Sequence, residues 1–378
     1  QSTWGNEYSR ASRKSAMGFL ARTLLSRAYY STGAEAQTYF ARARDAAKAV
    51  IDNRAALEVE LWANYADLWN PANNKRNREA LYVVSNSTNP TINYDLNGNR
   101  LYQVFQARYN GKPGLAQSLE YGFENNRRLM PTLSFLDYFN ENIDSRYEAS
   151  FQELWIANTN FTWTASLAAT HRKHPSVIGK VIRAGIDTAL LITKKVVPNH
   201  RLRPYIVIDR DSVYNTNGTI ITGADYINFR KFRDPDRTAA NAQPGFKDVI
   251  VMRLAEMYII AAEAEWKLNN PGAAADYINV LRTRAARKTP VNQTAAMQIS
   301  AANINEDFIL KERARELSGE HTRWTDLKRT GKLNKTYLDQ TNPIAGANFV
   351  DEKHTVRPIP RSFLDAISNS KEFGNNGY

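Results

Sequence analysis

One helix-length segment, residues 304–318, constrains the fold of this chain more than any other stretch. Two apolar and three charged residues recur on one of its faces at helical spacing: Ile309, Arg313, Glu316, Leu317 and Glu320. Charges on an otherwise apolar stripe are costly to bury unless each is paired with an opposite charge. Arg323 and Asp326 lie close enough in sequence to act as partners. We therefore predict an internal ion-pair network that fixes how this helix packs.

The start of this helix is predicted from Asn303 and Glu306, which have the spacing of a capping-box variant. An acid–base pair of carboxylates for catalysis is the functional alternative for its acidic residues. Carboxylates interleaved with this many arginines favour a structural role, so no catalytic residue is assigned.

Two helical hairpins are predicted, over residues 9–52 and 249–287, each with apolar residues at helical spacing on both sides of a turn. Alanines at the crossing points allow close approach, and two similar units suggest tetratricopeptide-like repeats. Any antiparallel helix pair would look similar, because the full repeat consensus is absent. The apolar stripe of the first helix is Met17, Leu20, Ala21, Leu24, Leu25 and Ala28.

The middle of the chain, residues 86–245, differs in kind. Residues 86–165 hold 14 aromatic residues and 12 asparagines among 80 positions, with weak periodicity and frequent turns. Strand-like runs follow at 203–209 and 218–221. We expect long, ordered excursions from a helical scaffold with short strands, and such loops usually serve function.

The net charge of +12, from 50 basic and 38 acidic residues, raises the question of nucleic-acid binding. The basic residues form scattered pairs rather than long runs, which favours a solvated surface and argues against a nucleic-acid partner. The chain has no cysteine, which excludes disulfides and thiolate metal sites. No apolar run approaches the ~20 residues of a membrane-spanning helix.

Four ordered blocks carry a family resemblance. They are residues 253–264 (RLAEMYIIAAEA), 279–285 (NVLRTRA), 312–329 (ERARELSGEHTRWTDLKR), and the closing 358–360 (PIP) with 376–378 (NGY). In order and spacing they resemble the SusD/RagB family of Bacteroidetes outer-membrane nutrient-binding lipoproteins. Weaker agreement extends upstream, through 226–233, 131–146 and 62–69. The family's further N-terminal helices and its lipid-anchored cysteine are not in this chain, so we expect part of the family's N-terminal segment to be missing.

The resemblance implies a single SusD-like unit over residues 1–378 that is mainly α. It would comprise tetratricopeptide-like hairpins (1–85), a loop-rich, partly β ligand-binding region (86–245) and a C-terminal helical region (246–378). It also implies non-catalytic capture of a glycan or other nutrient at the outer, extracellular face of the cell outer membrane. The ligand would pass to a SusC-like TonB-dependent transporter, with the lipid anchor outside this chain and no cofactor.

Candidate ligand contacts come from the region rich in asparagine and aromatic residues. Aromatic rings offer an apolar face to a sugar, and planar amides can bridge adjacent hydroxyls. The candidates are Trp155, Trp163, Tyr94, Tyr102, Tyr109, Tyr121, Asn93, Asn97 and Asn99. Core packing is the alternative for every ring. Trp155 and Trp163 are the favoured pair because Asn and Thr flank them in an irregular segment.

Other chemistries find little support. His171 and His174 have a spacing that a helix could turn into a metal pair, but no third ligand is evident and Pro175 ends any helix there. Asp209 and Asp211 lack the ligand-rich loop of a calcium site. Two other function classes stay open: a helical-repeat scaffold for a protein or peptide, and a glycoside hydrolase, which needs two opposed carboxylates.

Overall fold

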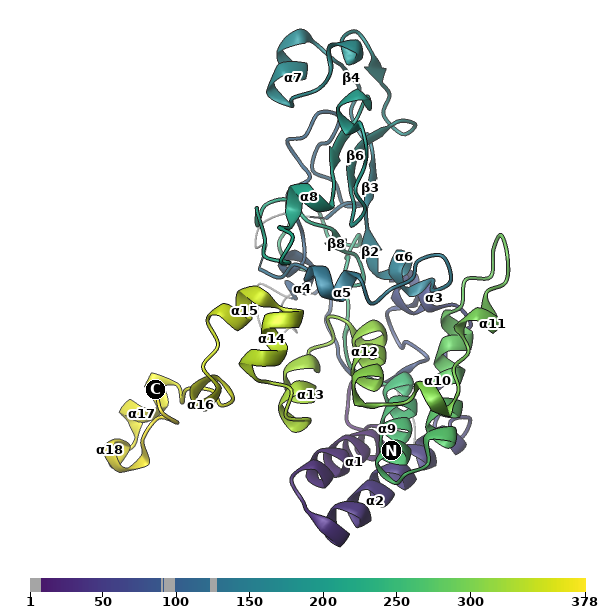
Figure 1. The fold of residues 1–378 in the computed structure, drawn as a ribbon, viewed down its shortest axis with the longest axis vertical. Helices are drawn as coiled ribbons and strands as arrows, with labels where there is room; N and C mark the ends of the chain where they lie inside the picture. The colour runs from purple at the N-terminus through teal and green to yellow at the C-terminus, as the bar shows by residue number, and fades with distance from the viewer. Residues whose placement is uncertain (1–7, 90, 92–98, 123–127) are drawn as a thin grey trace.

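A stack of four helices forms one end of the molecule (Figure 1). The structure is a computed structural model that describes residues 8–89, 91, 99–122 and 128–378. In packing order the stacked helices are α1 (Arg13–Tyr29), α2 (Gly33–Asp52), α9 (Leu254–Lys267) and α10 (Pro271–Ala285). Both predicted hairpins are confirmed, and they adjoin in space although the chain between α2 and α9 folds elsewhere.

Helix α9 lies in the middle of this stack because its sequence is apolar or small on nearly every side. All residues from Leu254 to Glu265 are buried, and α9 contacts α2, α10 and α12 (Glu306–Leu317). Helix α1 lies at one end of the stack, and seven of its 17 residues are buried. Leu20, predicted on the apolar stripe of α1, is therefore 52% exposed.

Residues 99–122 and 128–246, which we call the head, form the opposite end of the molecule (Figure 1). Strands β3, β6 and β7 make a three-stranded sheet in which β6 and β7 run parallel, while β2 pairs with β8 and β4 with β5. The head strands are β2 (Phe151–Gln152), β3 (Leu154–Ile156), β4 (Phe161–Thr162), β5 (Val181–Ile182), β6 (Thr188–Ile192), β7 (Ile206–Ile208) and β8 (Asn228–Phe229).

The strand predicted at 203–209 is present as β7, but that at 218–221 is wrong. Only a single bridge joins Tyr214 and Ile220 there, because the intervening residues form a tight turn. Short helices connect the head strands and link the head to the stack. They are α3 (Tyr65–Trp69), α4 (Leu101–Val104), α5 (Leu133–Leu136), α6 (Arg146–Ser150), α7 (Ala165–Thr170) and α8 (Arg210–Val213), with 3₁₀ turns η1 (Pro71–Asn73), η3 (Pro175–Val177) and η4 (His200–Leu202).

A two-stranded antiparallel ribbon connects the stack with the head. Strand β1 (Ala80–Val84) pairs with β9 (Val249–Arg253), and Ala80 lies opposite Arg253. Because β9 runs directly into α9, this ribbon links the entry of the chain into the head with its return to the stack. The result is a mainly helical protein with small sheets, which confirms the predicted fold class.

The core of the head is rich in aromatic side chains. Phe151 makes edge-on contacts with Phe139 and Phe229 at ring-centre distances of 5.7 and 5.3 Å. Such pairs add roughly 0.5–1.5 kcal/mol beyond burial alone. Aromatic side chains make up 11 of the 26 buried residues of the head's hydrophobic core, and aliphatic side chains the other 15, so the short strands are held together by large rings packed among aliphatic residues.

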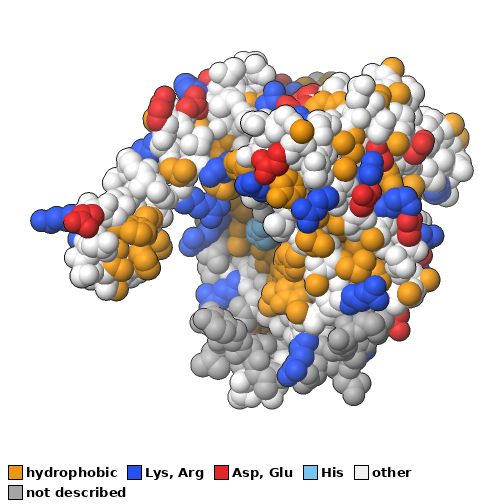
Figure 2. Space-filling view, turned by 90° about the horizontal axis from the view of Figure 1, so that it is seen from below, with side chains coloured by type: hydrophobic (Ala, Val, Ile, Leu, Met, Phe, Trp, Pro, Cys, Tyr) orange, Lys and Arg blue, Asp and Glu red, His pale blue; other side chains and the backbone are white. Residues whose placement is uncertain are grey.

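The remaining helices follow α10 along the chain, and the last three lie in a tail that projects from the body (Figure 1). Figure 2 shows apolar side chains gathered on this tail, where Phe363 and Phe373 are 47% and 53% exposed. No helix in the described ranges is long and apolar enough to cross a lipid bilayer. These helices are α11 (Thr294–Met297), η5 (Ala301–Asn303), α12, α13 (Arg323–Arg329), α14 (Lys335–Thr341), α15 (Pro343–Ala347), α16 (Asp351–His354), α17 (Arg361–Ala366) and α18 (Ser370–Phe373).

Helix α12 begins two residues later than predicted. Its N-cap is Asn305, whose side-chain oxygen accepts the Phe308 N–H at 2.9 Å. Asn303 belongs to the preceding turn η5, where it pairs with Ser300 instead. The side chain that caps the helix is therefore the asparagine nearest its first turn.

The charged row of α12 forms the predicted ion-pair network. Glu316 accepts bonds from Arg284 at 2.5 Å, Arg253 at 2.7 Å and Arg146 at 3.1 Å. Arg253 also pairs with Glu79, just before β1, at 2.8 Å. All of these side chains are buried. One carboxylate thus ties α12 to α6, α10 and the β1–β9 ribbon.

A second cluster joins α12 to the stack. Arg313 pairs with Asp326 of α13 at 2.9 Å, which confirms Asp326 as a partner. Arg329 of α13 binds both Asp326 and Glu263 of α9. The predicted role of Arg323 is wrong, because its guanidinium donates to the Leu310 carbonyl and the Tyr337 hydroxyl instead.

The arginines keep the network ionised despite its burial. Burial by itself would raise the pKa of Glu316, but Arg284, Arg253 and Arg146 outweigh it and lower that pKa to about 2. The pKa of Arg253 is raised well above its usual range: burial opposes the shift, but its carboxylate partners prevail. The buried carboxylate of Glu316 therefore stays ionised because arginines surround it.

We predict that Glu316→Gln lowers the free energy of unfolding by about 3–5 kcal/mol, because the neutral amide leaves three buried guanidinium groups under-compensated. Urea denaturation followed by circular dichroism measures the change. Glu352→Gln, on the exposed surface of α16, is the matched control and should shift stability by less than about 0.5 kcal/mol. Equal unfolding curves for the two variants would contradict the role of the network.

Stability should also fall in acid. The pKa of Glu316 is depressed on folding, so its contribution is complete above the unfolded value of ~4.3 and is lost as the pH falls toward 2. The shift corresponds to about 3 kcal/mol for this one group. Unfolding free energies measured by urea titration between pH 7 and pH 2.5 should decline below about pH 5. A flat profile over that range would be inconsistent with the shift.

Candidate functional site

The five predicted aromatic contacts that the structure describes are core residues. Trp155 and Trp163 are 0% and 1% exposed, and Trp163 donates its indole N–H to the Pro204 carbonyl at 2.7 Å. Tyr102, Tyr109 and Tyr121 are also buried, with each hydroxyl donating to a backbone carbonyl. A ring enclosed on both faces cannot stack on a sugar, so their assignment as ligand contacts is corrected.

The asparagine candidates divide in two. Asn99 uses its amide internally, donating to the Lys247 carbonyl at 3.0 Å and accepting the Leu101 N–H at 2.8 Å. Its role is therefore to hold the strand-like turn beside Gly245. Asn93, Asn97 and Tyr94 lie outside the described residues and stay predictions.

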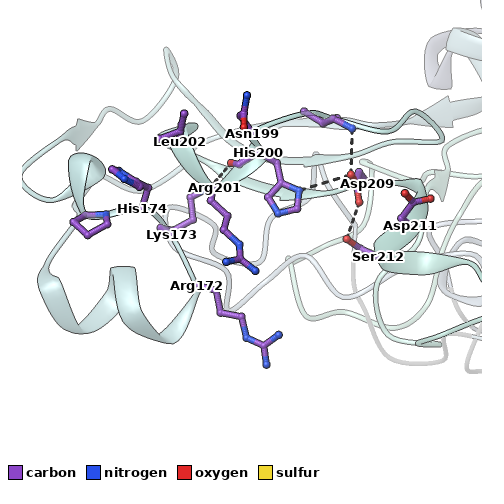
Figure 3. Close-up of a pocket in the computed structure, with 12 residues that line it drawn as sticks. Arg172, Lys173, His174, Asn199, His200, Arg201, Leu202, Asp209, Asp211 and Ser212 are labelled. Carbon is purple, nitrogen blue, oxygen red and sulfur yellow. Dashed lines mark hydrogen bonds and ion pairs between the residues drawn. The ribbon is translucent and has the colours of Figure 1, made fainter.

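An open cleft of about 980 Å³ in the head is the candidate site (Figure 3). Three segments line it: residues 172–175 after α7, residues 197–202 around η4, and residues 209–212 at the start of α8. Most of the side chains are polar, and basic groups outnumber acidic ones. The chemistry of the cleft is therefore electrostatic.

The first two segments are held together by hydrogen bonds. The His174 N–H donates to the Arg201 carbonyl at 3.0 Å. The Lys173 ammonium donates to the carbonyls of His200 at 3.0 Å and Tyr205 at 2.8 Å, and burial lowers its pKa to about 8. The Lys173 ammonium thus holds these segments together and is not a free cation.

Asp209 fixes the third segment. Its carboxylate accepts the Ser212 hydroxyl at 2.7 Å and the Val197 N–H at 3.1 Å, and lies 3.7 Å from the His200 ring (Figure 3). Burial would raise the pKa of Asp209, but these hydrogen bonds and His200 prevail and lower it. This carboxylate is ionised and internally satisfied.

Arg172 and Arg201 differ from Lys173 and Asp209, whose side chains are bonded to the backbone around them. Both are exposed, and Figure 3 shows their side chains extending in the same direction. Neither guanidinium has a carboxylate partner among the residues that the structure describes. Two planar, permanently charged groups with free donors therefore border the cleft.

The backbone at this rim adopts left-handed conformations. Arg172 has φ 50° and Asn199 has φ 54°. The Arg172 N–H donates to Ala169 and the Lys173 N–H to Ala168, which is the Schellman ending of α7. Glycine is usual at that position, and a larger side chain costs about 1 kcal/mol or more. Strain at a non-glycine residue often marks a functional position.

Three of the cleft residues, His174, Asp209 and Asp211, were already considered in the sequence, but as metal ligands. The His171–His174 pair does not form a metal site, because α7 ends at Thr170 and His174 Nδ1 accepts the Ser176 N–H at 3.2 Å. No group of three potential ligands is found in the part of the chain that is described. The useful signal was Arg172 between the histidines, together with the His200-Arg201 pair downstream.

Comparison with known proteins is consistent across sequence and structure. A model of the SusD family matches residues 139–371. SusD-like protein P38 of Formosa agariphila is 36% identical over 113 residues, which are 28% of this chain and 21% of that protein. Starch-binding protein SusD of Bacteroides thetaiotaomicron is 24% identical over 361 residues, which are 94% of this chain and 59% of that protein.

Among solved structures, surface glycan-binding protein A from Bacteroides thetaiotaomicron, in complex with laminarihexaose, shares the fold. It is 17% identical with a TM-score of 0.57, covering 99% of this chain and 66% of that one. This chain therefore spans about three fifths of SusD and about two thirds of that solved chain.

The burial of the two tryptophans yields a prediction. Trp155→Ala and Trp163→Ala should each lower the free energy of unfolding by about 3–5 kcal/mol, because each leaves a large cavity in the head. The change is read as a shift in the urea midpoint. Ile186→Ala, on an exposed side chain, is the control and should leave the midpoint nearly unchanged. Tryptophan variants with parental stability would be evidence that the rings are not core.

Proposed function

The chain belongs to the SusD family, and from this premise we propose that it is a glycan-binding protein of the cell surface without catalytic activity of its own. The family match carries the proposal, since it spans both the cleft and the α12 network. The relatives whose printed names refer to starch or to laminarihexaose support a glycan as the ligand class. We further propose residues 86–245 as the ligand-binding region.

The ionic state of the carboxylates supports binding rather than hydrolysis. Glycoside hydrolysis needs one carboxyl group with a raised pKa, to act as general acid, opposite a second carboxylate. The pKa values of Glu312, Glu316 and Asp209 are all lowered: burial opposes each shift, but arginine partners or hydrogen bonds prevail. Residues 312–317 (ERAREL) are thus suited to packing α12 rather than to acid catalysis.

Delivery to a partner completes the proposal. We propose that the captured oligosaccharide passes to a SusC-like TonB-dependent transporter, with the protein held at the outer membrane by a lipid anchor outside this chain. The predicted alternative, a helical-repeat scaffold for a protein or peptide, would use the stack instead of the head.

A panel of neutral and charged polysaccharides tests the proposal directly. Retention in affinity gels, with albumin as the control protein, should show binding to at least one polysaccharide. No reducing ends should be released during incubation with the same material. Release of sugar that is lost in a single Asp or Glu variant would establish a hydrolase. Binding to peptides alone would establish the scaffold.

A further inference from the structure

We propose that the cleft recognises anionic groups on the glycan, uronate carboxylates or sulfate esters, through Arg172 and Arg201. This inference rests on the proposed glycan binding and names the class of sugar. Both guanidinium groups are exposed at the rim, extend in the same direction, and lack a carboxylate partner among the described residues.

The charge balance of the cleft favours an anion. Three cationic side chains, Arg172, Lys173 and Arg201, line the cleft together with two carboxylates, Asp209 and Asp211. Asp209 is occupied by the Ser212 hydroxyl, the Val197 N–H and His200. The positive charge at the arginine rim is therefore not cancelled by the nearest buried carboxylate.

The donors are arranged for planar or tetrahedral oxyanions. A guanidinium presents paired N–H groups that match two oxygens of a carboxylate or sulfate, which an ammonium cannot do. The bond from His174 N–H to the Arg201 carbonyl ties the two arginine-bearing segments together. His174 Nδ1 is an acceptor for Ser176, so the neutral ring carries its proton on Nε2 as a further exposed donor.

The lining also argues against stacking on a neutral sugar. No Phe, Tyr or Trp lines the cleft in the described structure. The nearby Trp163 ring is buried, with its N–H on Pro204. Neutral sugars rely on aromatic faces for most of their apolar contact. Charge recognition is therefore the mode that these side chains can supply.

Matched ligand pairs test the inference on the full 378-residue chain. Isothermal titration would compare oligogalacturonate with its carboxyl-reduced form, and a sulfated galactan oligosaccharide with its desulfated form. At least one anionic member should bind roughly tenfold or more tightly than its neutral counterpart. The pair whose anionic member binds more tightly shows whether the recognised group is a carboxylate or a sulfate ester. Affinity should fall as salt is raised.

Matched protein variants locate the contact. Arg172→Gly, which suits the left-handed backbone, and Arg201→Ala should each weaken anionic binding about tenfold or more. Arg42→Ala, an exposed arginine on α2 in the stack, removes the same charge and should leave affinity unchanged. The unfolding curve of Arg201→Ala should match the parent, and Arg172→Gly should be at least as stable because glycine relieves the left-handed strain. Stability that is kept in both variants separates a lost contact from a lost fold.

Each other outcome overturns the inference. Binding of neutral glycans alone would contradict the recognition of anionic groups, while the proposed glycan binding would be retained. Anionic binding that both arginine variants retain would place the site elsewhere. Failure to bind any glycan in the panel would remove both proposals. Arginine-dependent binding of duplex DNA in place of anionic glycans would assign the cleft to a nucleic acid.

Discussion

The carboxylate of Glu316, shared by Arg146, Arg253 and Arg284, is the interaction on which the arrangement of this molecule depends. Those arginines come from α6, the β1–β9 ribbon and α10, so one buried point joins head, ribbon and stack. Buried ion pairs often add little net stability compared with apolar packing, yet losing one partner is expensive. The network therefore acts mainly by penalising every arrangement in which these segments do not meet.

The cost of burying an unpaired charge also explains why Arg172 and Arg201 of the head lie at the surface. Inside the network, Arg253 and Arg284 lose water but gain carboxylate and carbonyl acceptors in exchange. Arg172 and Arg201 remain in solvent without such compensation in the described chain, while the groups around them, Lys173 and Asp209, are used to hold the backbone. Arg172 and Arg201 are therefore the guanidinium groups of this cleft that a ligand can reach.

Sequence reasoning captured what depends on local periodicity. The helical hairpins and the charged face of α12 follow from spacing alone, and Asp326 was identified as a partner because it is near in sequence. Arg323 was equally near, but the turn before α13 directs it to Leu310 and Tyr337. Five of the predicted ring contacts are buried instead, because aromatic residues beside asparagines suit a sugar platform and a core equally well. The basic residues at 172–173 and at 200–201 are visible in the sequence, but the contacts that bring residues 172–175 and 197–212 together are not.

The mislocated rings and the charged cleft have a common cause. Strands of two to five residues give the head few ladder hydrogen bonds, so its stability must come from side chains that bury large areas. Placing Trp155 and Trp163 in that core leaves polar turns to form the surface. A ligand that approaches those turns meets hydrogen-bond donors and positive charge rather than ring faces. In this head, the demand for a core thus determines which side chains the surface around the cleft can offer to a ligand.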